Sequence, residues 1–388
     1  MYPLLNGLRV IEISAFVAVP FCGNTLAQLG AEVIRIDPPG GGVDYRRWPL
    51  SDEGGSIYWS GLNHAKRHVS ADLRDQETQK IVTDLLGDDG IVITNLSPKF
   101  LMDGKLLAEK PRTIIATLEG FPDGRPAVDY TVNAASGLPL ITGPEDATGP
   151  INAPFPTWDM LAGLHLALAL VAAERRRRIE GRGAWIRCSL SDVMLSAMTT
   201  LGFVGETEVT QNSRQRVGNH IYGTFGHDFS TADGKRLMLV ALTPRQWAEL
   251  CATTQTEAEF SEIERGKGLD LRNEADRFSA REDIRRVLAA WFAQRTLEQV
   301  KETFASSSIC WQPYQTIDEL KQPGGLIESS AILERVSHHD VGEIWTAGPV
   351  FRLEGEARAP LRATPSQARK ETIADLTGRD LAGARHED

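Results

Sequence analysis

One aspartate stands in a sequence context that suits covalent chemistry. Asp159 follows the segment 154–158 and opens an almost wholly apolar stretch that is predicted to be a helix over 159–180. Two interpretations of this residue are open. An aspartate at a helix start commonly caps the first turn and complements the helix dipole. A carboxylate at a pocket-facing helix N-terminus can instead attack a thioester and form a covalent acyl intermediate, with backbone amides stabilising the developing charge.

Other kinds of catalytic site lack their usual sequence signatures. The eight histidines form no HExxH or other spaced metal motif, so no metal site is expected. His165 lies inside the apolar helix and is expected to be a core histidine. The sequence has no GxSxG elbow and no P-loop, which removes the usual support for hydrolase and kinase chemistry.

The N-terminal third predicts a sheet that would position such a site. Strand-like and helical segments alternate along it, which favours parallel pairing with right-handed crossovers. Strands are expected at 8–14, 32–36, 69–73, 91–94 and 113–118, and helices at 15–29 and 76–86. The fold class is therefore α/β, a doubly wound large domain whose ligands lie beyond the carboxyl ends of the strands.

A loop of glycines follows the second predicted strand. Gly40, Gly41 and Gly42 come after two prolines, and no GxGxxG follows the first strand, so a dinucleotide fingerprint is not indicated. The loop is either a flexible surface turn or a ligand-facing segment. Arg46 and Arg47 come next, and a guanidinium suits phosphate or carboxylate recognition, although solvated surface arginines are the alternative.

The sequence changes character near residue 224. Strand-like segments 225–231 and 236–241 flank Asp233-Gly234, which predicts a β-hairpin. Helical stretches follow at 280–294 and 297–306. We therefore expect a large α/β domain beginning with 1–224, a smaller α+β domain over 225–325, and a C-terminal segment 326–388 with strand-like pieces at 343–346 and 350–353.

Composition bounds the class of protein. Among 388 residues, 42 are Lys or Arg and 52 are Asp or Glu, and the formal charge of −10 argues against a nucleic-acid partner. The four cysteines form no CxxC pair, which favours reduced thiols in a cytoplasmic protein. The longest strongly apolar run, 160–173, is shorter than the ~20 residues of a membrane span, so no membrane partner is expected.

Short segments along nearly the whole chain resemble the family III CoA-transferases (CaiB/BaiF-like proteins). The matching segments are 5–12, 29–38, 62–67, 72–74, 94–98, 134–137, 141–143 and 159–163, followed by 181–183 and 189–192. Each is weak alone, but their order and spacing are specific. The resemblance implies a Rossmann-like large domain and a smaller domain. It also implies that the segment 326–388 returns to the large domain. It also implies an interlocked homodimer.

The resemblance assigns roles to individual residues. Asp159 matches the family nucleophile, which would form a mixed anhydride with the acyl group of an acyl-CoA and then an aspartyl-CoA thioester. Coenzyme A enters as part of the substrate, and no permanently bound cofactor is expected. Positions expected to contact CoA or substrate are Val17, Ala18, Arg46, Arg47, Arg74, Asn95 and Tyr130. For the Tyr130 ring, core packing is the alternative role, and Trp158 is expected beside the nucleophile.

Departures from the family pattern narrow the reaction. Racemase members carry a His-Asp pair, and the matching Val128-Asp129 lacks the histidine, which argues against proton abstraction beside the thioester. Segments 14–20, 25–30 and 40–49 resemble the branch that moves CoA between the two carboxylates of one mesaconyl group. Intramolecular transfer is therefore expected. An intermolecular acyl-CoA:carboxylate transferase and a CoA-binding protein without catalysis remain as alternatives.

Overall fold

A computed structural model describes residues 1–102, 104–365 and 371–372 of the chain. The chain forms two compact units. The large unit comprises Met1–Ser136, Ala153–Glu206 and the described residues from Ser329 onward, and the small unit comprises Gly137–Asn152 and Thr207–Glu328.

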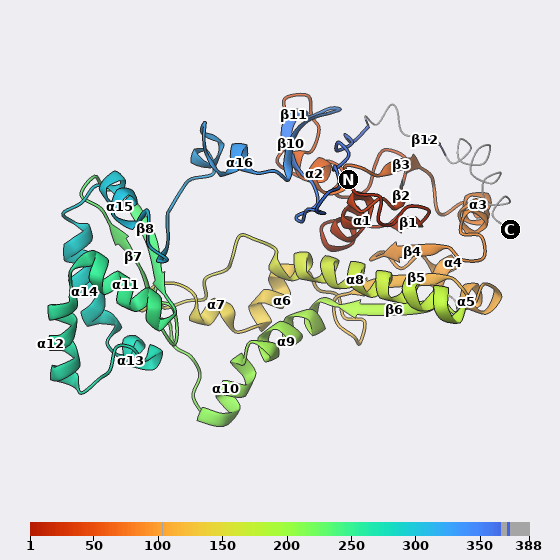
Figure 1. The fold of residues 1–388 in the computed structure, drawn as a ribbon. Coiled ribbons are helices and arrows are strands. Elements are labelled where there is room, and N and C mark those ends of the chain that lie inside the picture. The colour runs from red at the N-terminus through yellow and green to blue at the C-terminus, as the bar shows by residue number, and fades with distance from the viewer. Residues whose placement is uncertain (103, 366–370, 373–388) are drawn as a thin grey trace. The chain divides into compact units, whose positions relative to one another are not determined.

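The large unit is built on a parallel sheet of seven strands in the order β12-β3-β2-β1-β4-β5-β6 (Figure 1). The strands are β1 (Arg9–Ile13), β2 (Glu32–Asp37), β3 (Arg67–Ser70), β4 (Ile91–Thr94), β5 (Ile114–Glu119), β6 (Ala184–Ser189) and β12 (Glu371–Thr372). The central strands β1, β2, β4 and β5 are buried along nearly their whole length, as expected for a sheet covered on both faces. This confirms the predicted α/β class.

Helices pack on both faces of this sheet. On one face, α3 (Gln76–Leu85), α4 (Lys99–Met102) and α5 (Lys105–Glu109) share an apolar cluster with β1 to β5. On the other face, α1 (Ala18–Gln28) and α8 (Thr157–Glu180) pack against each other and against the strands. The remaining helices and strands outside the small unit's core are α2 (Ile57–Asn63), α6 (Asp129–Ala135), α9 (Leu190–Thr200), α10 (Phe203–Thr210), α16 (Leu326–Ser329), β10 (Leu333–His338) and β11 (Gly342–Ala347).

Helix α8 carries the candidate nucleophile in its first turn and ends at Gly181, whose φ of +72° is typical of a helix C-terminal glycine. Near this end the buried Arg177 pairs with Glu174 and donates to the carbonyls of two segments beside the sheet. His165 is exposed, so its expected core position is wrong. Among the described residues α8 is long and apolar enough to cross a membrane, but 44% of its most apolar window is buried in the fold.

The small unit has an antiparallel sheet of β7 (Phe225–Ser230), β8 (Arg236–Ala241) and β9 (Cys310–Pro313), which confirms the predicted hairpin. Its helices are α7 (Leu138–Ile141), α11 (Pro244–Thr254), α12 (Glu257–Lys267), α13 (Glu274–Ser279), α14 (Arg281–Phe292), α15 (Leu297–Phe304) and the 3-10 turn η1 (Glu319–Lys321). Aromatic side chains from the sheet and from α11, α12, α14 and α15 fill the core.

The small unit includes two segments outside the expected 225–325, namely 137–152 and 207–224. Arg216, on the second of them, holds the first, because its guanidinium donates to four carbonyls of 137–152. The acceptors are Pro139, Thr142, Ala147 and Gly149, at 3.1, 2.9, 2.6 and 2.5 Å.

One predicted strand is wrong. Residues 350–353 form no strand, and two of them contact Tyr2 instead. The Phe351 ring stacks on Tyr2 with 5.8 Å between centroids, and the Leu353 amide donates to the Tyr2 hydroxyl at 3.3 Å. The apolar Phe351 thus reflects packing of two chain segments and not a sheet.

Candidate active site

A cavity of about 740 Å³ opens at the carboxyl ends of β1, β4, β5 and β6, within the large unit. Loops after these strands and the first turns of α6 and α8 supply its walls. The lining residues are Phe16, Val17, Arg47, Tyr58, Asn95–Ser97, Leu118–Gly120, Gly124–Tyr130, Pro154, Pro156, Asp159, Arg187 and Leu190. This is the edge at which open α/β sheets bind ligands.

Two carboxylates meet at the start of α8. Asp129, the first residue of α6, accepts the main-chain N–H groups of Trp158 and Asp159 through one oxygen, at 2.7 and 3.0 Å. The helix has no side-chain cap of its own, so Asp129 satisfies two of its free amides from a neighbouring helix. The helix-capping role considered for Asp159 is therefore performed by Asp129, and the Asp159 side chain lines the cavity.

The surroundings of Asp159 favour its neutral form more than water does. Burial raises the pKa of this carboxyl to about 7, the nearby Asp129 charge adds to the rise, and Arg47 opposes it. Burial also raises the pKa of Asp129, against the two amide hydrogen bonds that favour its charge. A weakly solvated carboxylate that still ionises near neutrality is suited to nucleophilic attack on a carbonyl carbon.

Arg47 lies on the cavity wall against two aromatic rings. Its guanidinium carbon is 5.7 Å from the Phe16 ring centroid and 5.0 Å from that of Tyr58. Within the described part of the chain this guanidinium forms no ion pair, whereas two other cavity arginines are engaged. Arg187 binds Glu119 through two hydrogen bonds, and Arg125 pairs with Asp123. Arg47 is thus the cavity cation that remains open to an anionic ligand.

A second, smaller cavity of about 290 Å³ lies at the ends of β1, β2 and β3. Its lining is mostly apolar and includes Ile13, Ile36, Pro38 and Leu73. Arg74 stands at its edge, largely exposed, with its guanidinium on the Asp72 carboxylate at 2.7 Å.

The predicted contact residues fall into three groups. Val17, Arg47, Asn95 and Tyr130 line the same cavity as Asp159, and Arg74 lines the smaller one. Ala18 is buried in the first turn of α1, and Arg46 is exposed and lines neither cavity.

The expectation for Trp158 needs revision. Its ring is buried and does not line the cavity, and its indole N–H donates to Asn133 at 3.2 Å. Phe16, Tyr58, Arg125 and Arg187 are cavity residues that the sequence did not single out. The residue spacing held no signal for them, because each reaches the cavity through a separate loop or strand end. Among the described residues, no group of three or more His, Cys, Asp or Glu side chains could hold a metal ion.

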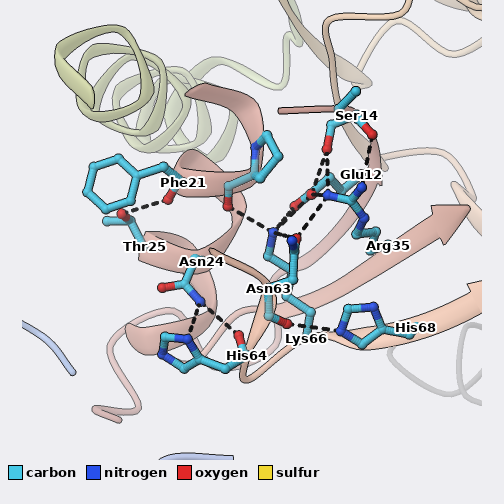
Figure 2. Close-up of polar contacts among 12 residues, drawn as sticks. Glu12, Ser14, Phe21, Asn24, Thr25, Arg35, Asn63, His64, Lys66 and His68 are labelled. Atoms are coloured by element: carbon cyan, nitrogen blue, oxygen red, sulfur yellow. Dashed lines mark hydrogen bonds and ion pairs between the residues drawn. The ribbon is translucent and has the colours of Figure 1, made fainter. Parts of the chain in front are cut away.

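A buried ionic network joins two cations, Arg35 and Lys66, to three carboxylates, Glu12, Asp37 and Asp44. Figure 2 shows Glu12 between the two cations. Glu12 lies between Arg35 and Lys66, and Asn63 accepts from both cations. Burial lowers the pKa of Lys66 to about 8 even though Glu12 favours its charge. Arg35, with no exposed surface, also binds Asp37 and Asp44.

Comparison with known proteins identifies the family. The model of CoA-transferase family III matches residues 5–369. The chain belongs to CoA-transferase family III. It is 40% identical over 372 residues to the 2-methylfumaryl-CoA isomerase of Chloroflexus aurantiacus, covering 94% of this chain and 91% of that one.

Two further comparisons show lower identity. The succinyl-CoA:glutarate CoA-transferase of Mus musculus is 26% identical, covering 92% of this chain and 83% of that protein. A solved CAIB/BAIF family protein from Brucella suis superposes with a TM-score of 0.76 at 21% identity and covers 99% of both chains, which shows a shared fold. The predicted resemblance to this family is confirmed.

Proposed function

We propose that this chain moves CoA within one dicarboxylate, converting mesaconyl-C1-CoA to mesaconyl-C4-CoA. Mesaconyl is another name for the 2-methylfumaryl group, and the 40% identity to a 2-methylfumaryl-CoA isomerase supports this substrate. The structural observation that carries the proposal is the Asp159 carboxylate, poorly solvated in a cavity whose wall also holds the unpaired Arg47 guanidinium.

The proposed reaction uses Asp159 as nucleophile. Its carboxylate attacks the C1 thioester carbonyl and expels CoA thiolate, which leaves a mixed anhydride. The thiolate then attacks the aspartyl carbonyl, releasing the mesaconate C1 carboxylate and giving an aspartyl-CoA thioester. The C4 carboxylate attacks the carbonyl of the aspartyl-CoA thioester, which breaks the C–S bond, expels CoA thiolate and forms a second anhydride. The thiolate then attacks the C4 carbonyl, which yields the isomer and releases the Asp159 carboxylate. Holding mesaconate in the cavity makes the later steps effectively unimolecular.

We assign binding roles to the remaining predicted residues on the same basis. Arg47 would hold the free carboxylate of the acyl group, because the other two cavity arginines already bind protein carboxylates. Val17, Asn95 and Tyr130 would contact the pantetheine or acyl part in the larger cavity. Arg74 beside the smaller cavity would contact the nucleotide end of CoA.

Incubation of the purified protein with mesaconyl-C1-CoA alone tests intramolecular transfer. We expect chromatography to show the C4 isomer without an added acid. When ¹³C-labelled free mesaconate is added in a second incubation, we expect no label in the product. If isomer forms only when an acid is added, the protein is instead an intermolecular transferase, the activity named for relatives that use succinyl-CoA.

An Asp159→Asn variant separates catalysis from binding. We expect isomerisation to fall by at least about a thousandfold, because the nucleophile is lost, while calorimetry still detects CoA binding. A variant that keeps the parent rate would remove Asp159 from the mechanism. A parent protein that binds CoA but transfers it to no acid would support the alternative of binding without catalysis.

The interlocked homodimer implied by the family resemblance stays a prediction, as does the cytoplasmic location. Light scattering on the purified protein should give a mass near twice the 42.6 kDa of one chain. A mass of 42.6 kDa would contradict the dimer.

A further inference from the structure

Phe16 has an unusual backbone conformation on the cavity wall. Its φ is +65°, in the left-handed region that bulky side chains rarely adopt. Such a conformation is energetically unfavourable and persists only where neighbouring groups hold it in place. Phe16 is also one of the two residues whose rings contact the Arg47 guanidinium, so its conformation bears directly on the cavity.

Two side chains hold the main chain around Phe16. The Phe16 N–H donates to the Asp44 carboxylate at 2.9 Å. Just before it, Ala15 is bound through both its N–H and its carbonyl by the Asn95 amide, at 3.0 and 2.9 Å. The Asp44 bond therefore fixes the one amide at which the chain changes to the left-handed conformation.

Asp44 holds the second wall residue as well. The Arg47 N–H donates to the Asp44 carbonyl at 3.0 Å, and the Arg47 carbonyl accepts from the Ser56 hydroxyl at 2.5 Å. Asp44 itself is 1% exposed, and its carboxylate contacts the Arg35 guanidinium at 3.3 Å. The glycine-rich loop is thus anchored to the buried ionic network at one residue.

We propose that Asp44 is a positioning residue for CoA transfer, which fixes Phe16 and Arg47 relative to Asp159 without touching the substrate itself. The chain from Arg35 through Asp44 joins a rigid strand to the two wall residues that would enclose the acyl group. This inference rests on the proposed function, because it takes the larger cavity as the acyl site. Burial raises the pKa of Asp44, and Arg35 and the Phe16 amide oppose that rise, so the ionised carboxylate has specific partners.

The test compares Asp44→Asn with Asp37→Asn. Both substitutions remove a buried carboxylate partner of Arg35, but the Phe16 amide donates to the Asp44 carboxylate. Asparagine offers one acceptor oxygen to the Arg35 guanidinium and the Phe16 amide, where Asp44 offers two. For Asp44→Asn we therefore expect kcat to fall roughly 10- to 100-fold, because small displacements of positioning groups have effects of that size, with KM changed less than about threefold. Asp37→Asn should keep kcat within about threefold of the parent.

A second readout follows the fate of the anhydride. With a loosened wall, water can attack the anhydride carbonyl, which restores the Asp159 carboxylate, yields free mesaconic acid and leaves CoA as a free thiol. We expect thiol release per turnover to rise at least about fivefold in Asp44→Asn and to stay at the parent level in Asp37→Asn. A purely structural role for Asp44 would lower the active fraction of both variants and leave this ratio unchanged.

Phe16→Gly keeps the test decisive if Asp44→Asn does not fold. Glycine accepts the left-handed conformation, and the substitution leaves the buried network intact. It should lower kcat and raise thiol release as Asp44→Asn does, and in the double variant the two effects should not add. Equal losses in Asp44→Asn and Asp37→Asn, additive effects in the double variant, or parent behaviour of Phe16→Gly would overturn the proposal.

Failure of the proposed function is distinguishable from failure of this inference. If the parent protein does not isomerise mesaconyl-CoA, the same variants are compared in exchange of CoA between succinyl-CoA and a labelled acid. Asp44→Asn should then show the same loss of kcat and the same excess thiol release. Parent-like values in that exchange would refute the role of Asp44 whatever the natural acid is.

Discussion

The two aspartates at the start of α8 divide two tasks that the sequence could not separate. Asp129 accepts the free amides of the helix, and Asp159 is left to the cavity. The resemblance predicted Asp159, because a family motif spans its own segment. The capping role of Asp129 depends on a contact between residues 30 positions apart, which no local pattern encodes. For the same reason, the sequence could not predict that the Arg47 guanidinium forms no ion pair within the described residues.

The raised pKa of Asp159 makes this residue costly for stability. In the folded protein the carboxyl keeps its proton up to a pKa of about 7, whereas the unfolded chain releases it near 3.8. The folded state therefore binds more protons between these values, and stability falls as pH rises through that window. We expect Asp159→Asn to be more stable than the parent by roughly 1–3 kcal/mol at pH 8.

Urea unfolding measures this difference. The gap between Asp159→Asn and the parent should narrow from pH 8 to pH 5, because the parent carboxyl is then protonated in the folded state. A gap that is absent at pH 8, or that widens toward pH 5, would contradict the raised pKa.

Removing the charge of Asp129 should shift the pH profile of the rate. Asparagine retains an oxygen for the Trp158 and Asp159 amides but no longer raises the pKa of Asp159. The acidic limb of kcat/KM should move to lower pH, and the ratio of the rate at pH 6 to that at pH 8 should rise roughly two- to threefold. Asp84→Asn, which removes an exposed carboxylate paired with Lys80, serves as the control and should leave the profile in place.

At the scale of elements, α8 is placed by a close crossing with α1. A Cβ added to Gly163 would lie 2.6 Å from the Ala18 carbonyl oxygen and 3.0 Å from the Phe21 ring. Gly163→Ala should therefore destabilise the protein by roughly 1–3 kcal/mol and lower the rate, since relief of the clash moves the first turn of α8. Gly61→Ala, at a helix position with nothing within 4 Å of the added Cβ, should be neutral or slightly stabilising.

Thermal unfolding and steady-state rates of these two variants check the crossing. Equal melting temperatures for both variants would show that α1 and α8 can separate without cost.

Elements with strong local signals could be predicted well. The alternating strands, the Asp-Gly hairpin and the long apolar helix all appear close to their expected positions. The exposed His165 shows where this reasoning failed, because residue composition identified an apolar helix but not which side of it faces the core. Residues 350–353 failed for a related reason, since their partner Tyr2 is nearly the whole chain away.

At the scale of the whole molecule, the chain leaves the large unit after α6 and returns to it before α8. The excursion 137–152 joins the small unit through the four carbonyls bound by Arg216. Composition predicted a second domain but gave no sign of this earlier contribution, because the segment has no hydrophobic period of its own.

Arg216→Lys should loosen the attachment of segment 137–152 to the rest of the small unit. One ammonium cannot satisfy carbonyls spread around a planar guanidinium, so several of the hydrogen bonds are lost. We expect amide exchange and proteolytic cleavage within 137–152 to increase roughly tenfold, with peptides of the parallel sheet unchanged. Arg245→Gln, at an exposed arginine paired with Glu249 on α11, is the control, and equal protection of 137–152 in all three proteins would contradict the clamp.

The raised pKa of Asp159 also couples ligand binding to proton uptake, and so to pH. An anionic acyl group that engages Arg47 takes away the charge that now favours the ionised carboxyl, and a second anion nearby favours the neutral form further. Near neutrality, capture of an unreactive thioether analogue should therefore draw up to about half a proton from the buffer. Calorimetric heats that vary with the ionisation enthalpy of the buffer would reveal this uptake, and identical heats in phosphate and Tris would exclude it. In the complex, the Asp159 carboxyl would then be largely protonated, and reaction would begin when it loses that proton.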